Sequence, residues 1–417
     1  MEIGMINTIF EFWSSFVFLY PLLMAIVWLA GSVIYYVRRE GKRSREIPDL
    51  DWPLISILVP CYNEEDTVVE TVENLLKLDY PNKEIICVND GSKDNTAQLI
   101  HDLAKQYDIV RAIDNKENKG KANALRLALF ASKGEYLLCV DSDAILDNDA
   151  PYHLIKHFFL KGERVGAVTG NPRIRNRDTM LARMQVVEYA SIIGAIKRTQ
   201  RIIGKIMTVS GVIVCFRKKA LVDVGLWDVD MITEDISVSW KLHERFWDIR
   251  YEPNALCWML VPEKINGFWK QRVRWAQGGQ EVIMRHWKII LNWKYRRLWP
   301  IYYEQWTSIF WSYSLLFITL YYFIFTVDTW EGLFLLLTFS AFSLTVLSVV
   351  QLTISLLIDS RYDNVTKSYF WVAWYPFAFW FINALVAIFA LPKAIKSRMR
   401  GGYAVWSSPD RGNREIK

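Results

Sequence analysis

Four long segments of this chain contain no Asp, Glu, Lys or Arg. They cover residues 16–37, 306–327, 332–358 and 369–391, and each is long enough to cross roughly 30 Å of hydrocarbon as a helix. A buried core helix is the alternative, but helices of water-soluble proteins seldom extend past about 20 residues without a charge. The pattern therefore predicts helices that span a membrane or enter it deeply.

The first apolar segment differs from a secretory signal, which has basic residues before a shorter apolar core. Here Glu2 and Glu11 precede the segment, and five Lys or Arg residues follow it within residues 38–45. Because basic residues favour the cytoplasmic side, we expect a membrane anchor over residues 1–45 whose C-terminal end is cytoplasmic. The central region of the chain would then face the cytoplasm.

The number of membrane spans stays open. Three C-terminal spans would place the end of the chain outside, yet four Lys or Arg residues between 393 and 400 favour the inside. Residues 369–391, which contain Pro376 and Asn383, and residues 298–311 are both candidates for a re-entrant or interfacial segment. We expect transmembrane helices over residues 298–395 and a basic tail over residues 396–417.

The net charge of +6 concentrates beside the apolar segments. Basic residues in that position interact with anionic lipid head groups, so the charge predicts contact with a lipid bilayer and not with nucleic acid. The five cysteines are scattered, with no CxxC pair and no zinc spacing. Reduced thiols in a protein core are the simplest interpretation.

The middle of the chain alternates short apolar runs with amphipathic segments. Strands are expected at residues 54–59, 84–88, 110–113 and 136–140, and helices at residues 68–78, 95–106 and 121–131. This alternation predicts an α/β fold, a Rossmann-like domain over residues 50–295 with a parallel-rich sheet and helices on both faces. Ligands of such sheets bind beyond the carboxyl ends of the strands.

Polar side chains follow three of these strands. Asn63 and Glu64 come after the first, Asp90 ends the second within Val-Asn-Asp-Gly-Ser, and Asp141 follows the fourth. Converging at one edge of the sheet, they could bind the base and ribose of a nucleotide, although Asp90 could equally be an ordinary turn residue. Lys121 could contact the same nucleotide or face solvent.

Asp141 and Asp143 are separated by one residue and follow a buried strand. Two carboxylates placed so close repel each other, and a bound divalent cation relieves that repulsion. Mg²⁺ or Mn²⁺ there could bridge a diphosphate and stabilise it as a leaving group. A solvated loop is the alternative for an isolated pair of this kind.

Glu234 and Asp235 precede a segment of helical character. Thr233 could cap that helix, which would place both acids on its first turn. Asp235 is the candidate general base for a glycosyl transfer, because an attacking hydroxyl must lose its proton to a carboxylate. The alternative is that acidic residues simply complement the helix N-terminus.

The last motif is Gln271-Arg272-Val273-Arg274-Trp275. Arg274 could contact diphosphate oxygens, and Trp275 offers a flat apolar face on which a sugar ring can stack. Two segments near it are expected at the lipid interface: residues 181–203, which could also form a surface helix of the soluble domain, and residues 264–297, rich in Trp and basic residues.

Taken in order, these motifs resemble the processive, membrane-embedded branch of glycosyltransferase family two, which includes hyaluronan, chitin and cellulose synthases. Three further stretches, at residues 170–173, 274–279 and 406–412, are most similar to bacterial poly-β-1,6-N-acetylglucosamine synthases. The resemblance covers nearly the whole chain. One departure is visible: the family often has Gly after the helix of Asp235, where this chain has Phe246.

The resemblance implies a role for each matching residue. Glu234 and Asp235 would be catalytic, with Asp235 as the base, and Asp141 and Asp143 would bind the metal. The substrate-binding residues would be Asn63, Glu64, Asp90, Lys121, Asp141, Gln271, Arg272, Arg274 and Trp275. Within that set, Asp90 would contact uracil, Arg274 the diphosphate and Trp275 the acceptor.

The implied protein is a multi-pass enzyme of the cytoplasmic membrane that uses UDP-N-acetylglucosamine and Mg²⁺ or Mn²⁺ to extend a β-1,6-linked biofilm polysaccharide and to assist its export. A small membrane accessory subunit is implied in the same way. The alternatives are a chitin, hyaluronan or cellulose-type synthase, a polyprenyl-phosphate sugar transferase, and a receptor with a degenerate transferase fold. Trp275 disfavours the second, because a lipid phosphate does not need a sugar-stacking ring.

Overall fold

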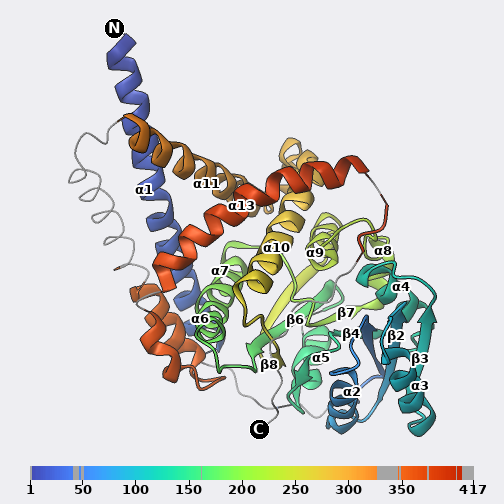
Figure 1. Ribbon diagram of the computed structural model, residues 1–417. Helices are drawn as coiled ribbons and strands as arrows, with labels where there is room; N and C mark the ends of the chain where they lie inside the picture. The colour runs from blue at the N-terminus through green and yellow to red at the C-terminus, as the bar shows by residue number, and fades with distance from the viewer. Residues whose placement is uncertain are drawn as a thin grey trace.

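The computed structural model describes residues 2–40, 47, 51–160, 162–325, 346, 349–372, 375–400 and 402–405. A long N-terminal helix, α1 (Glu2–Tyr35), continues through a π-helical turn, η1 (Tyr36–Glu40). Figure 1 shows α1 along one side of the molecule and an α/β domain on the other, with two long C-terminal helices, α11 and α13, above it.

An eight-stranded mixed sheet forms the centre of the α/β domain. Its strands are β1 (Ile55–Cys61), β2 (Lys83–Asp90), β3 (Val110–Asn115), β4 (Tyr136–Val140), β5 (Ile145–Leu146), β6 (Val165–Ile174), β7 (Ile213–Arg217) and β8 (Asp248–Met259). Their order is β3-β2-β1-β4-β7-β6-β8-β5. The first four pair in parallel, as predicted, whereas β7 is antiparallel to both of its neighbours.

Helices cover both faces of the sheet. They include α2 (Val68–Lys77), α3 (Thr96–Gln106), α4 (Lys121–Ala131), α5 (Ala150–Leu160), α8 (Lys218–Asp223) and α9 (Glu234–Glu244). Successive strand residues alternate between two cores: Ile57 packs with Leu75 and Ile100, and Leu58 packs with Leu125 on the other face. The predicted helices over residues 68–78, 95–106 and 121–131 are confirmed within two residues.

A helical run lies between the sheet and α1. It consists of α6 (Met180–Glu188), the π-helical turn η2 (Tyr189–Ile193) and α7 (Gly194–Ile203). The hydroxyl of Thr199 on α7 donates to the carbonyl of Trp28 on α1, 2.9 Å away. Several charged side chains of this run, including Lys197 and Arg198, are buried, and the contact of residues 181–203 with lipid stays a prediction.

The C-terminal half of the chain continues from α10 (Ile265–Arg285) through η3 (Trp287–Leu291) and η4 (Trp293–Tyr295) to α11 (Trp299–Phe325), and later through η5 (Thr366–Val372) to α13 (Tyr375–Arg400). Helix α13 packs on α10: Gln280 donates to the carbonyl of Ala387, and Val273 contacts Val386 and Ala390 in one apolar cluster. The predicted span at residues 332–358 lies mostly outside the described residues, as do residues 406–417 of the predicted tail.

Two of the described helices are long and apolar enough to cross a membrane. They are Glu11–Glu40 and Trp380–Met399, at the two ends of the chain. The interfacial segment predicted over residues 264–297 carries exposed apolar side chains, with Trp287 43%, Leu291 70% and Trp293 68% accessible. Its contact with lipid stays a prediction.

The turn after α9 contains a residue in an unusual backbone conformation. Phe246 has φ 62°, in the left-handed region that L-residues other than Asn and Asp rarely adopt. Its ring stacks on Tyr295 at 5.9 Å between centroids, and Lys294 Nζ lies 4.8 Å from the Phe246 ring centroid. These contacts offset part of the backbone strain.

Candidate active site

One cavity of about 330 Å³ brings together eight of the predicted site residues. These are Lys121, Asp141, Asp143, Glu234, Asp235, Gln271, Arg274 and Trp275. They come from the start of α4, the loop after β4, the start of α9 and the middle of α10. We call this space the acidic cavity, because four of the eight side chains are carboxylates.

Lys121 lies at the centre of the charges that face the acidic cavity. Its Nζ is 2.5 Å from Asp141 Oδ1 and 3.3 Å from Glu234 Oε1. Burial alone would lower the pKa of Lys121, but the two carboxylates outweigh burial and raise this pKa above its usual range. Lys121 is therefore a permanent cation shielded from solvent, contrary to the solvent-facing alternative.

Asp235 occupies the first turn of α9, as predicted. Its Oδ1 accepts a hydrogen bond from the backbone N–H of Ile236 at 2.9 Å. Burial, and after it the negative charge of Glu234, raises the pKa of Asp235 to about 6, while Lys121 opposes the rise. A carboxylate with this pKa is well matched to accepting a proton near neutral pH.

Gly211 keeps the approach to Asp235 open, and no motif in the sequence marks it. A Cβ added to Gly211 would lie 3.1 Å from Lys121 Nζ and 3.4 Å from Asp235 Oδ2. Any side chain at this position would press on both charged groups. The signal that could have found it is only a glycine just before a strand.

Thr233 occupies the N-cap position of α9, but the predicted side-chain cap is wrong. Its hydroxyl makes no hydrogen bond with any residue that the structure describes. The side chain packs instead on α10, where a Cβ added to Gly278 would lie 2.0 Å from Thr233 Oγ1. Gly278 thus lets α9 and α10 approach closely, which brings Asp235 and Trp275 to one cavity.

Arg272 belongs to the same motif as Trp275, yet it is not among the residues lining the acidic cavity. Its guanidinium pairs with Glu188 at 2.8 Å and lies 4.5 Å from the Trp275 ring centroid. Arg272 therefore fixes the orientation of the ring. Helical geometry could have shown the contact between Arg272 and Trp275, because residues three apart are neighbours on a helix surface.

Gln271 has an unused polar atom on the side that faces the acidic cavity. Its Oε1 is buried and makes no hydrogen bond with the described residues. Because it lines the acidic cavity, this oxygen is an acceptor available to a ligand hydroxyl or amide.

Asp90 is fully buried and is not among the residues that line the acidic cavity. Its carboxylate accepts hydrogen bonds from the backbone N–H groups of Lys119 and Gly120, and from the Asn115 side chain at 2.8 Å. These hydrogen bonds stabilise the loop that places Lys121 at the acidic cavity. A contact of Asp90 with uracil stays a prediction.

Asn63 and Glu64 likewise build the neighbouring turn and do not line the acidic cavity. Asn63 has φ 54°, and its side-chain oxygen accepts from the backbone N–H of Lys93. The backbone N–H of Glu64 donates to Thr96 Oγ1 at 2.7 Å. Both residues tie the loop after β1 to the loop after β2, and their contact with a nucleotide stays a prediction.

Asp141 and Asp143 are the candidate ligands for a divalent cation. Both line the acidic cavity, and burial raises the pKa of Asp141 although Lys121 opposes it, so additional positive charge would be favourable there. Among the described residues, no group of three or more His, Cys, Asp or Glu side chains could hold a metal. The pair fits an ion that takes its other ligands from phosphate and water, as Mg²⁺ does.

Comparison with known proteins gives the following matches. Residues 53–278 match a family model described as glycosyltransferase like family 2. A poly-β-1,6-N-acetyl-D-glucosamine synthase of Staphylococcus epidermidis is 48% identical over 413 residues, covering 96% of this chain and 98% of the relative. A synthase of the same name from Staphylococcus aureus (strain MSSA476) is 47% identical over 412 residues, with the same coverage.

A solved structure shares the fold. A mannosyltransferase from Pyrobaculum calidifontis, in complex with GDP-mannose and Mn²⁺, aligns with a TM-score of 0.63 over 91% of this chain and 99% of that chain, at 19% sequence identity. The agreement extends beyond the α/β domain, because 91% of the chain includes helices at its ends.

Proposed function

This chain belongs to glycosyltransferase family 2 and, within it, to the poly-β-1,6-N-acetylglucosamine synthases, and from that premise we propose that it polymerises N-acetylglucosamine from UDP-N-acetylglucosamine into a β-1,6-linked polysaccharide. The observation that carries the proposal is the acidic cavity, where the half-buried carboxylate of Asp235 lies with Lys121 and the ring of Trp275. Such a cavity offers a base, a cation for phosphate and a sugar platform together.

Asp235 is the proposed general base. An acceptor hydroxyl that attacks the anomeric carbon transfers its proton to Asp235, and the configuration at that carbon inverts as UDP departs. The pKa of about 6 leaves Asp235 ionised at neutral pH and still able to take the proton. Glu234 assists by electrostatics, since its charge helps to raise that pKa.

Lys121 and Arg274 are the proposed contacts of the donor diphosphate, because both are cationic and line the acidic cavity. A divalent cation bound by Asp141 and Asp143, when present, would neutralise charge on the departing diphosphate. The Mn²⁺ in the structurally similar mannosyltransferase is consistent with this use of a metal. Binding of the diphosphate would give Lys121 an additional anionic partner beside the carboxylates.

Trp275 is the proposed platform for the acceptor sugar. The ring lines the acidic cavity, and Arg272 stacks on it at 4.5 Å, which limits its rotation. A fixed aromatic face lets successive sugars occupy the same place after each transfer. This arrangement favours a growing polysaccharide as the acceptor.

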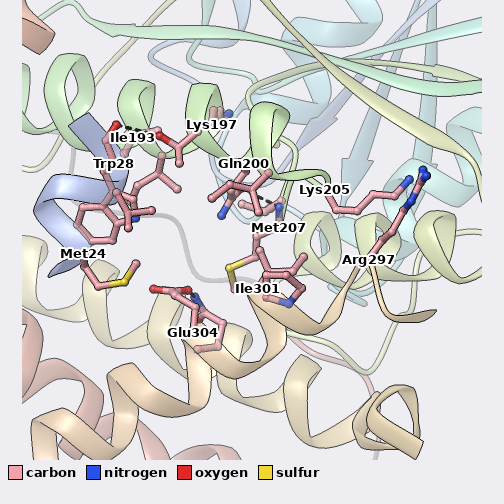
Figure 2. Close-up of a pocket in the computed structure, with 17 residues that line it drawn as sticks. Met24, Trp28, Ile193, Lys197, Gln200, Lys205, Met207, Arg297, Ile301 and Glu304 are labelled. Carbon is pink, nitrogen blue, oxygen red and sulfur yellow. Dashed lines mark hydrogen bonds between the residues drawn. The ribbon is translucent and has the colours of Figure 1, made fainter. Parts of the chain in front are cut away.

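A second cavity, of about 410 Å³, lies between α1, α7 and α11 (Figure 2). Its wall includes Trp28 of α1, Gln200 of α7 and Glu304 of α11, and it shares Ile193, Lys197 and Thr208 with the acidic cavity. The polymer leaves the site of transfer through this space in our proposal, which couples synthesis to export.

The same proposal places the protein in the cytoplasmic membrane as a multi-pass enzyme. Residues 1–45 anchor it, residues 50–295 form the cytoplasmic transferase domain, and residues 298–395 return to the membrane; the helices Glu11–Glu40 and Trp380–Met399 support membrane association. A small accessory subunit enters only through the family resemblance.

Product analysis tests the proposal. Purified protein in lipid vesicles would be supplied with Mg²⁺ or Mn²⁺ and with radiolabelled UDP-N-acetylglucosamine, UDP-glucose or UDP-glucuronate in separate reactions. We expect polymer from UDP-N-acetylglucosamine alone, and we expect a hydrolase specific for β-1,6 linkages to degrade it. A β-1,4-linked product, a requirement for UDP-glucuronate, or a lipid carrying one sugar would contradict the assignment.

A further inference from the structure

Lys197 is a buried lysine that the reaction described above does not use. It lies on α7 and is 5% exposed. Of the three residues that line both cavities, Ile193, Lys197 and Thr208, it alone carries a charge. Figure 2 shows it on the α7 side of the second cavity, across from Glu304 on α11. Lys197 therefore marks the junction of the two cavities.

The ammonium of Lys197 has hydrogen-bond donors that are not used within the protein. An ammonium group can donate three hydrogen bonds. The structure gives Lys197 one hydrogen-bond acceptor among the described residues, the hydroxyl of Ser210, and the Tyr251 ring centroid lies 5.8 Å from Nζ. Two donor positions therefore remain for a ligand.

Carboxylates do not compensate the charge of Lys197 directly. The adjacent Arg198 pairs with Glu40 at 2.7 Å and with Asp359 at 2.8 Å, whereas Lys197 forms no ion pair with a described carboxylate. Burial lowers the pKa of Lys197 to about 7, and the charge of Asp235 opposes that change. A buried cation of this kind gains from any oxygen acceptor that enters the junction.

Only a short segment of chain, Ser210 and Gly211, separates Lys197 from the proposed base, Asp235. Ser210 accepts from Lys197, and the next residue, Gly211, is the one on which an added Cβ would lie 3.4 Å from Asp235 Oδ2. A sugar with its attacking hydroxyl near Asp235 and its chain directed into the second cavity must pass Lys197. The phosphate-binding cations, Lys121 and Arg274, line the acidic cavity alone.

We propose that Lys197 binds the acceptor, donating hydrogen bonds to a hydroxyl or acetamido oxygen of the sugar at the junction of the two cavities. The proposal rests on the proposed function, since it needs a neutral, oxygen-rich chain as the acceptor. The interaction is a charge-assisted hydrogen bond, stronger than one between neutral groups. It fixes the position of the acceptor and takes no proton.

The test separates acceptor binding from donor chemistry. Lys197→Met removes the charge and keeps most of the length of the side chain, Lys197→Arg keeps the charge, and Lys105→Met makes the same change at an exposed lysine on α3. Each protein would be assayed for extension of short β-1,6-linked N-acetylglucosamine oligosaccharides, for UDP binding, and for hydrolysis of UDP-N-acetylglucosamine without acceptor.

For Lys197→Met we expect the KM for the oligosaccharide to rise roughly 10- to 100-fold, the loss of a hydrogen bond to a charged group. UDP binding and donor hydrolysis should be retained, because neither involves the junction. Lys197→Arg should recover part of the acceptor affinity, and Lys105→Met should behave as the unchanged protein.

Ser210→Ala tests a purely structural role. If Lys197 acted only by holding Ser210, this variant would show the same rise in acceptor KM as Lys197→Met, and that result would overturn the proposal. So would an unchanged acceptor KM in Lys197→Met, or an equal loss of extension, hydrolysis and UDP binding. Failure of the unchanged protein to make polymer would refute the proposed function instead.

Discussion

At the scale of single residues, the charge on Lys121 organises the site. One ammonium contacts Asp141 and Glu234, and its charge lowers the pKa of both Asp141 and Asp235 against the effect of burial. The group that would meet the donor diphosphate therefore also adjusts the proposed base. Donor and acceptor chemistry are linked through electrostatics within one cavity.

The pKa of Asp235 predicts the acid limb of the pH–rate profile. The base must be ionised, so on the acid side kcat/KM should fall roughly tenfold for each pH unit below the value of about 6. Polymer synthesis measured between pH 4.5 and 8 checks this. An acid limb with an apparent pKa near 4, the ordinary aspartate value, would contradict the raised pKa of Asp235.

Lys121→Met should move the acid limb to higher pH. Lys121 opposes the rise in the pKa of Asp235, and its removal leaves the effects of burial and Glu234 unopposed by that charge. We also expect weaker UDP binding, measured by calorimetry. Lys119→Met, two residues earlier in the chain, is the comparison: the Nζ of Lys119 lies 5.9 Å from the Tyr403 ring centroid, and Lys119 does not line the acidic cavity.

Eight residues that the sequence marked as candidates line the acidic cavity, whereas Asn63, Glu64, Asp90 and Arg272 do not. Asp141 and Asp235 could be placed at a strand end and on a first helical turn because local patterns mark those positions. The pairing of Lys121 with both Asp141 and Glu234 could not be predicted, since it depends on how α4 meets α9. Local patterns carry no information about that contact.

At the scale of elements, the approach of α9 to α10 brings the base to the acceptor platform. Thr233 packs against Gly278, with no room for a Cβ, and Arg272 holds Trp275 from the same helix. The sequence suggested a Thr233 cap because Thr is common at that position. Its contact with Gly278, 45 residues further along, is a tertiary feature with no local signature.

Gly278→Ala should separate the two helices. The added Cβ would lie 2.0 Å from Thr233 Oγ1, and overpacking of this kind costs about 1–3 kcal/mol. We expect a lower melting temperature and weaker synthesis. Gly279→Ala is the matched control, because its Cβ would meet Met207 at an ordinary 3.7 Å. Equal behaviour of the two variants would refute the close-approach argument.

The sheet shows where sequence patterns stop. The strands β1 to β3 are each followed by turn residues and a helix, and β4 is followed by the polar residues Asp141 and Asp143, so local patterns predict all four. The second half has β7 antiparallel between β4 and β6, and β5 of only two residues. The pairing of such short or antiparallel strands depends on contacts with residues that are distant in the sequence.

At the scale of the whole molecule, a buried ion network joins the α/β domain to the helices at both ends of the chain. Asp359, at the end of the apolar helix Val349–Asp359, pairs with Arg173 of β6 at 2.7 Å and with Arg198 of α7 at 2.8 Å. Arg198 also pairs with Glu40 after α1. The network fixes the second cavity relative to the acidic cavity.

The substitution Asp359→Asn should strongly destabilise the folded protein. Arg173 and Arg198 would lose a buried partner, and breaking such a pair costs about 3–5 kcal/mol. We expect a marked fall in the melting temperature of the protein in detergent. Glu70→Gln, which breaks an exposed pair with Arg175, should change stability by about 1 kcal/mol or less.

Polymer synthesis by Asp235→Asn in lipid vesicles tests the central claim most directly. The amide keeps the size of the side chain but cannot take the acceptor proton, so polymer formation from UDP-N-acetylglucosamine should be abolished while UDP binding is retained. Undiminished synthesis by Asp235→Asn would show that this carboxylate is not the base, and the assignment of the acidic cavity would fail.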